Sequence, residues 1–127
     1  MSLPVSARVE ATPNFLGNLD AAQAFFVAQD AESAAERFGK LKAELRDMVA
    51  ILAWSPASGR PARFLNGRSA QARIRKEVVL ELARQAGLPM LREHVLSRHV
   101  ALYAHSDDRV VLLALKHQRE LMYCAEV

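Results

Sequence analysis

Alternating apolar and polar residues predict a strand at the start of the chain. From Val5 to Ala11 every second residue is apolar, which is the period of a strand with one wet face. Thr12 and Pro13 then predict a helix start, with the threonine as N-cap and the proline in the first turn. A helix from there to about Ala28 would bury one stripe of apolar side chains: Phe15, Leu19, Ala22 and Phe26.

The next segment has the most regular helical pattern of the chain. Asp30 is placed to cap a helix that ends near Trp54, and its apolar positions recur at spacings of three and four: Ala34, Phe38, Leu41, Leu45, Met48 and Leu52. The stripe lasts only about two and a half heptads, which favours packing on a sheet over a coiled coil. The prolines and glycine of residues 55–61 predict a loop.

The C-terminal half changes from a helical pattern to strands. Residues 69–86 predict a third helix that ends before Gly87, with apolar residues four apart: Ala70, Ile74, Val78, Leu82 and Ala86. Three strands joined by short turns follow: Met90–Leu96, His99–His105 and Arg109–Leu115. The last is apolar on both faces, which is typical of an interior strand.

The turn at Ser97-Arg98 predicts the register of its hairpin. If these two residues form the turn, Leu96 faces His99, and Arg92 lies opposite Tyr103. The register across residues 106–108 is left open.

Length and composition indicate one folded domain. The chain has 127 residues, 51% of them hydrophobic and 24% charged, which excludes long disorder and low-complexity classes. The stretch without charge at residues 49–59 is shorter than the roughly 20 residues of a membrane span. The single cysteine, Cys124, can form no internal disulfide, and no secretory signal pattern is visible. We expect no membrane association and a cytoplasmic location.

The net charge of +3 is concentrated in one segment. Six cations and no acid lie between Asp47 and Glu77: Arg60, Arg63, Arg68, Arg73, Arg75 and Lys76. Such a cluster can attract nucleic acid or an acidic protein segment. A solvated basic face without a partner is the alternative.

Few residues suggest catalysis or metal binding. The four histidines lack metal-site spacing, no serine lies in a Gly-x-Ser-x-Gly turn, and the five glycines are scattered, so we expect no metal and no cofactor. Lys116, His117, Arg119 and Tyr123 could bind phosphate and transfer protons during RNA cleavage. The alternative is a polar strand end whose tyrosine packs on the core.

Several short segments, taken in order, resemble the ParE/RelE superfamily of bacterial toxins, the plasmid stabilisation proteins. They are Thr12-Pro13, Asp30 with residues 34–38, Pro56 with residues 59–61, residues 91–93, residues 100–103, and residues 110–115 followed by His117-Gln118-Arg119. The resemblance covers most of the chain. Residues 67–88 look like a helical insertion relative to the compact form of the family.

The resemblance implies an α+β fold, a small antiparallel sheet with an N-terminal helical hairpin on one face, in the order β-α-α-(α)-β-β-β. It further implies the toxin of a type II toxin–antitoxin system, with a cognate antitoxin as partner and no cofactor. By comparison with the family, Tyr103 would face the helices. We therefore expect Arg92 and Tyr103 to have a structural role first and a functional role second. An apolar groove left open without a partner would favour an antitoxin complex or a homodimer.

Two activities occur in the superfamily, and one position separates them. RelE-like mRNA interferases carry an arginine just before the strand, at the position where this chain has Val100. The valine lacks the positive charge that stabilises the transition state of RNA cleavage in those enzymes. We therefore favour a ParE-like protein that inhibits growth by binding DNA gyrase. The alternatives are a ribosome-dependent endoribonuclease using His117, Arg119 and Tyr123, and a non-toxic binding module whose partner surface includes Lys116 and the basic segment at 60–76.

Overall fold

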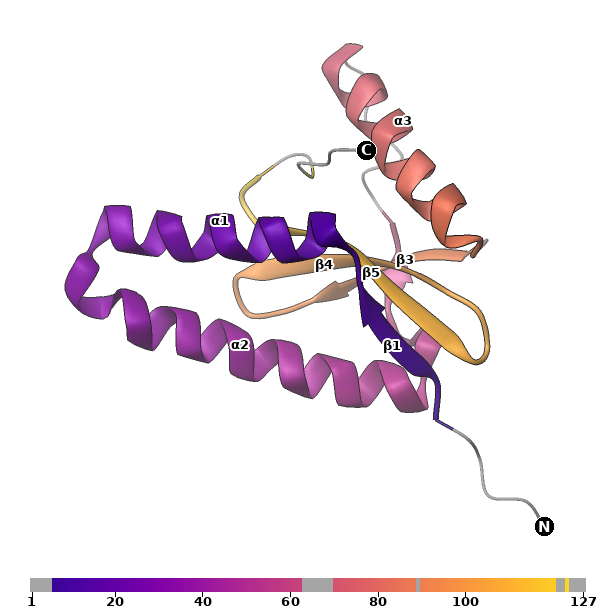
Figure 1. Cartoon of the computed structure of the whole chain (residues 1–127), viewed down its shortest axis with the longest axis horizontal. Coiled ribbons are helices and arrows are strands. Elements are labelled where there is room, and N and C mark those ends of the chain that lie inside the picture. Colours follow the sequence, from indigo (N-terminus) through magenta and orange to yellow (C-terminus); the bar gives the residue numbers. More distant parts are fainter. Residues whose placement is uncertain (1–5, 63–69, 89, 121–122, 124–127) are drawn as a thin grey trace.

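The computed structural model describes residues 6–62, 70–88, 90–120 and 123, without the side chains of residues 70–73 and 75. Within these ranges the chain forms three α-helices and a five-stranded sheet of order β1-β5-β4-β3-β2 (Figure 1). The elements are β1 Arg8–Ala11, α1 Pro13–Gln29, α2 Ala31–Trp54, a 3-10 turn Pro56–Ser58, β2 Arg60–Pro61, α3 Ala70–Ala86, β3 Met90–Val95, β4 His99–His105 and β5 Arg109–His117. The predicted α+β class and the order of its helices are confirmed.

The sheet is mixed, which corrects the expectation of a wholly antiparallel sheet. β1 pairs in parallel with β5, whereas β5 with β4, β4 with β3, and β3 with β2 are antiparallel. The predicted register of the β3–β4 hairpin is confirmed, because Arg92 lies opposite Tyr103. Leu112 is the partner of Tyr103 on β5, after an irregularity between Leu102 and Tyr103. β5 is interior, as its apolar sequence predicted.

Two capping residues start the helices of the hairpin where the sequence predicted. The Thr12 hydroxyl accepts a hydrogen bond from the Phe15 amide at 3.1 Å and donates one to the Leu112 carbonyl at 3.0 Å, so it also ties α1 to β5. Asp30 caps α2 through the Glu32 amide at 3.1 Å. The stripes of α1 and α2 face the sheet and form one core cluster with Tyr103 and Leu112, although Leu19, Ala22 and Phe38 are only partly buried.

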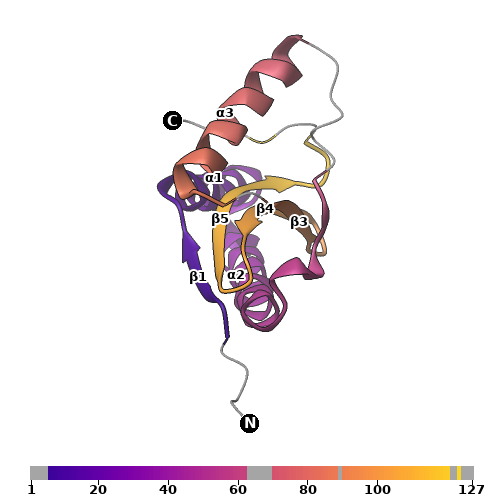
Figure 2. The ribbon, with the colours of Figure 1, turned by 90° about the vertical axis from the view of Figure 1, so that its right-hand side faces the viewer.

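α3 covers the opposite face of the sheet (Figure 2). Among the α3 side chains that the structure describes, Val79, Leu82 and Ala83 are buried. The predicted stripe is therefore wrong in part, since Ile74 is 65% exposed. Gly87 ends the helix with a φ of 72°, the left-handed conformation that favours glycine after a helix.

β2 lies in the segment that the sequence predicted as a loop. It is two residues long, and Arg60 pairs with Glu93 of β3. The turn before it is held by the sheet, because the Tyr103 hydroxyl donates to the Pro56 carbonyl at 2.7 Å and accepts from the Gly59 amide at 2.9 Å. Arg92 donates to the Gly59 carbonyl at 2.9 Å. A strand this short has no periodicity from which it could have been predicted.

Candidate functional site: a groove at the end of the helical hairpin

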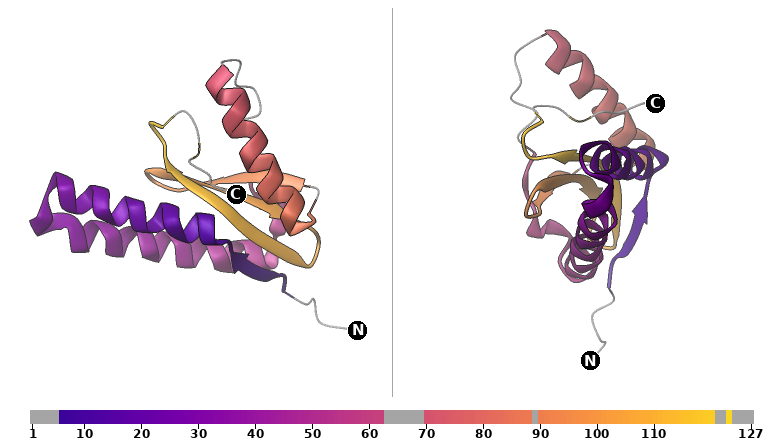
Figure 3. Two further views of the ribbon diagram at one scale, coloured as in Figure 1. Left: turned by 45° about the horizontal axis from the view of Figure 1, so that its top comes forward. Right: turned by 90° about the vertical axis from the view of Figure 1, so that its left-hand side faces the viewer.

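The helical hairpin extends beyond the strands (Figure 3). Residues of α1, of α2 and of the end of the sheet line a hollow beside it. One cavity of about 780 Å³ lies between α1 and the end of β5, and a second of about 330 Å³ lies beside α2. We call the two together the hairpin groove, because they share five lining residues: Phe26, Arg37, Arg98, His99 and His117.

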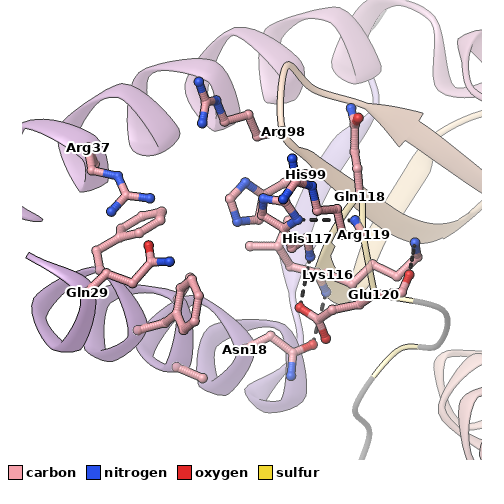
Figure 4. Close-up of a pocket in the computed structure, with 15 residues that line it drawn as sticks. Asn18, Gln29, Arg37, Arg98, His99, Lys116, His117, Gln118, Arg119 and Glu120 are labelled. Carbon is pink, nitrogen blue, oxygen red and sulfur yellow. Dashed lines mark hydrogen bonds between the residues drawn. The ribbon is translucent and has the colours of Figure 1, made fainter.

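Rings in edge-on contact form the floor of the hairpin groove. Phe26 and His99 are 5% and 6% exposed, with their ring centres 6.1 Å apart in an edge-on contact. His117 meets His99 edge-on at 5.2 Å, and the Arg37 guanidinium lies over the Phe26 ring at 4.4 Å. Figure 4 shows Arg37 on the hairpin facing His99 and His117 across the cavity. Phe25, beside this floor, is 53% exposed.

A turn at residues 117–120, at the end of β5, forms the side of the groove that faces the helical hairpin. The Arg119 amide donates to His117 Nδ1 at 3.1 Å, and the His117 amide donates to the Glu120 carboxylate at 3.1 Å. The Gln118 amide donates to the Arg98 carbonyl at 2.9 Å, which fastens this turn to the β3–β4 turn. The backbone that presents Arg98 and Arg119 is therefore held in place.

Positive charge predominates around the groove. The two cavities together are lined by five cations, namely Arg37, Lys40, Arg98, Lys116 and Arg119, and by two carboxylates, Glu44 and Glu120. Both carboxylates are already engaged: Glu44 accepts hydrogen bonds from the Ser97 amide and hydroxyl, and Glu120 accepts from the His117 amide. Within the described part of the chain, the guanidinium groups of Arg98 and Arg119 form no hydrogen bond or ion pair.

Burial affects the titration of the groove residues. Burial lowers the pKa of His99 below its ordinary value of 6.5, and the neighbouring His117 lowers it further, against the attraction of Glu120 and Glu44. Burial also lowers the pKa of Lys116, while Glu93 and Glu120 act in the opposite direction. His99 therefore favours its neutral form.

A second polar cluster is buried under α3, on the other face of the sheet. The Tyr123 hydroxyl donates to the carboxylate of Glu93, and the two residues are 1% and 2% exposed. Arg60 forms an ion pair with the same carboxylate at 3.4 Å, and the Lys116 ammonium lies 5.5 Å from the centre of the Tyr123 ring. Burial raises the pKa of Tyr123 well above its ordinary value of 10.0, and the bond to Glu93 raises it further.

The structure does not bring the predicted catalytic residues together. His117 lies on the hairpin side of the sheet against His99, Arg119 is exposed at the edge of the groove, and Tyr123 is buried on the α3 side. Tyr123 therefore packs on the core as the alternative interpretation predicted.

The structure describes the side chains of three of the seven residues predicted for partner binding. Arg60 is half-buried in its ion pair with Glu93, and Lys116 donates a hydrogen bond to the Glu120 carbonyl at 2.9 Å. Lys76 lies half-buried on α3. Arg63 and Arg68 lie outside the described residues, as do the side chains of Arg73 and Arg75 on α3.

Lys116, His117 and Arg119 of the groove were predicted from the sequence as candidate site residues, whereas Phe25, Arg37 and Arg98 were not. Phe25 adjoins the predicted stripe of α1 without belonging to it. An exposed aromatic beside a helix stripe was the one signal available. Among the described residues, no three His, Cys, Asp or Glu side chains come close enough to hold a metal ion. No helix in the described ranges is long and apolar enough to cross a membrane.

Comparison with known proteins identifies the fold. No protein-family model and no curated protein matches the chain. A solved structure described as the chromosomal ParDE TA system from P. aeruginosa contains a similar chain, with a TM-score of 0.56 and 16% sequence identity. The similarity covers 88% of this chain and 96% of that one. The chain therefore has the fold of a protein from a ParDE system, as the ParE/RelE resemblance predicted.

Proposed function

We propose that this protein is the toxin of a type II toxin–antitoxin pair, neutralised by a cognate antitoxin and acting in the cytoplasm. The observation that carries the proposal is the fold shared with a chain of a ParDE system over most of both chains. The proposal treats the chain as one toxin domain, with residues 67–88 as an insertion. Within the superfamily we assign it to the ParE-like branch, which inhibits growth by binding DNA gyrase.

Two features support inhibition by binding over RNA cleavage. Val100, at the position where RelE-like nucleases carry arginine, is 2% exposed and packs in the apolar cluster under α3. His117 and Tyr123 lie on opposite faces of the sheet, so their side chains could not act on the same phosphate without a rearrangement. If this chain were a nuclease, it would lack the arginine at position 100 and would have no acid and base that reach the same phosphate.

Expression of the chain alone in a bacterial host tests the proposal. We expect growth arrest together with DNA breaks trapped by gyrase, and intact mRNA. Arrest with cleaved mRNA and intact DNA would support the endoribonuclease instead. Normal growth in cells that contain the folded protein would contradict a toxin and support the non-toxic binding module.

Substitution of the candidate catalytic residues provides a separate test. The variant with His117→Ala and Tyr123→Phe should still arrest growth, provided that circular dichroism shows it folded at the assay temperature. Loss of toxicity in the folded variant would support RNA cleavage through these side chains.

We include the basic segment at 60–76 in the proposal as a surface that contacts an anionic partner. Neutralising Arg68, Arg73 and Arg75 together should weaken partner binding and reduce its dependence on salt. Unchanged binding would identify these residues as a solvated face.

A further inference from the structure

We propose that the hairpin groove is a binding site for a small nucleoside phosphate. In this arrangement the phosphoryl group lies between Arg37 and His99, and the base lies against the exposed ring of Phe25. The proposal goes beyond the toxin–antitoxin assignment, because it depends only on the side chains of the groove and holds whether or not the chain arrests growth.

His99 is a buried polar residue whose ring opens onto the groove. The residue is only 6% exposed, and it lines both cavities. Its ring meets Phe26 and His117 edge-on but forms no hydrogen bond with any described residue. Every described side-chain nitrogen or oxygen that is closed to water has a hydrogen-bond partner, so the unpaired nitrogens of His99 reach the cavities that it lines. A ligand that bonds to this ring would satisfy it.

His117 provides a second hydrogen-bond donor beside this ring. The Arg119 amide donates to His117 Nδ1 at 3.1 Å, so in the neutral ring the proton lies on Nε2. That N–H group has no acceptor in the described part of the chain. Arg37 faces both imidazoles across the cavity (Figure 4). A phosphoryl group placed between them would therefore accept hydrogen bonds from two sides.

The free cations around the hollow suit a dianion. Arg37 lies with its guanidinium 4.4 Å from the centre of an aromatic ring, a contact that uses none of its N–H donors. Among the described residues it has no carboxylate partner, and neither have Arg98 and Arg119. Both carboxylates of the groove, Glu44 and Glu120, already accept hydrogen bonds from the chain itself. A phosphate monoester has a charge of about −1.5 to −2 near pH 7 and three acceptor oxygens, so it matches this excess better than one carboxylate.

The hairpin wall of the groove offers a surface for a flat ring. Phe25 is 53% exposed beside a cavity of about 780 Å³, a volume in the usual range of ligand pockets. Bases stack on aromatic side chains that are open in this way. Gln29, one turn further along α1, lines the same cavity, and its amide offers donors and an acceptor to the edge of a base (Figure 4).

A single nucleotide fits this groove better than a strand of nucleic acid. A strand needs cations along the path of its successive phosphates. Here Glu120 lines the larger cavity and Glu44 the smaller one, so each cavity contains a carboxylate that would repel a further phosphate.

The experiment titrates the full chain with each of the four common nucleoside monophosphates. The controls are the corresponding nucleosides, ribose phosphate and a short single-stranded RNA. Calorimetry measures the affinities, and NMR follows the ring protons of His99 and His117. We expect at least one nucleotide to bind about tenfold or more tightly than its nucleoside and than ribose phosphate, because only the nucleotide has both base and phosphoryl group. The same nucleotide should shift both imidazole signals.

Matched charge variants on α2 locate the phosphoryl group. Arg37→Gln should weaken nucleotide binding by about tenfold, since it removes a charged donor. Arg46→Gln makes the same charge change on the same helix, at a residue that lines neither cavity, and should change binding by less than about twofold.

An apolar pair on α1 locates the base. Phe25→Ala should weaken binding by about fivefold or more, because the base loses its stacking surface. Leu16→Ala should leave binding unchanged, although Leu16 is equally exposed at 51% on the same helix.

Three results would overturn the proposal: equal effects within either matched pair, imidazole signals that do not shift, or no nucleotide that exceeds its controls. Tighter binding of the RNA than of every nucleotide, lost in the Arg37→Gln variant, would also overturn it and identify a nucleic-acid surface instead.

Discussion

Replacing Tyr123 by phenylalanine tests whether this tyrosine anchors the fold. Its side chain is 1% exposed, and its hydroxyl donates to a Glu93 carboxylate that is 2% exposed. Burial, and after it the contact with Glu93, raise the pKa of Tyr123, so the hydroxyl stays protonated and keeps donating throughout the neutral pH range. Phenylalanine keeps the ring and removes this donor.

The lost hydrogen bond should lower the free energy of unfolding by about 2 kcal/mol. Hydrogen bonds to charged groups contribute about 1.5–3 kcal/mol net, and the buried Glu93 carboxylate would lose one of its donors while keeping its desolvation cost. No cavity is created, because the phenyl ring fills the same space. For a chain of this size, about 2 kcal/mol corresponds to a fall of roughly 5–10 °C in the melting temperature.

Equilibrium unfolding in urea, followed by circular dichroism, measures this loss. The midpoint should fall while the slope with urea stays unchanged, because the surface exposed on unfolding is the same. In a Glu93→Leu background the acceptor is absent, so Tyr123→Phe should then cost less than about 0.5 kcal/mol.

Two results would contradict this role of the Tyr123 hydroxyl. One is a loss below about 0.5 kcal/mol for Tyr123→Phe in the native background, since that is within the range of surface substitutions. The other is an equal loss in both backgrounds, which would assign the effect to packing of the ring and not to the bond with Glu93.

Three further predictions concern the fold and its titration. Gly59→Ala should destabilise by about 2 kcal/mol or more in urea unfolding, because its Cβ would lie 2.6 Å from the Glu93 carbonyl oxygen, whereas Gly39→Ala in the open middle of α2 should stabilise by about 0.5–1 kcal/mol. Thr12→Ala should cost about 1–2 kcal/mol through the lost helix cap, and a melting temperature equal to the native value would contradict that role. Because burial lowers the pKa of His99, its contribution to stability is complete above pH 6.5 and is lost as the pH falls toward the folded-state pKa. The His99→Gln variant should therefore lose less stability than the native chain between about pH 7 and about pH 5. Equal losses in the two proteins would exclude His99 as a cause.

Local patterns predicted the elements whose causes lie within a few residues. Thr12 and Asp30 cap their helices because a cap depends on an amide only two or three positions away. The pairing of Arg92 with Tyr103 followed from a two-residue turn, since a turn determines the register of the strands beside it. β2 could not be predicted from local patterns, because its two residues are too few to show a hydrophobic period and they form a strand only by pairing with β3.

The candidate functional residues were harder to predict than the helices and strands, because their role depends on which face of the sheet each side chain occupies. Tyr123 follows the last strand by a few residues in the sequence and was grouped with His117, but the chain turns between them and Tyr123 is buried under α3. Arg60 belonged to a run of cations that appeared available to partners, and its ion pair with Glu93 depends on a residue more than thirty positions away.

The helices, the three long strands, one hairpin register and the α+β class could all be predicted from the amino-acid sequence. These properties follow from periodicity and from caps and turns, which act over short distances along the chain. The meeting of Phe26, Arg37 and His99 in a groove, and of Glu93 and Tyr123 under α3, depends on the packing of the whole fold. Such contacts depend on how far the hairpin extends beyond the sheet and on which helix covers each face, and no local pattern encodes either distance or face.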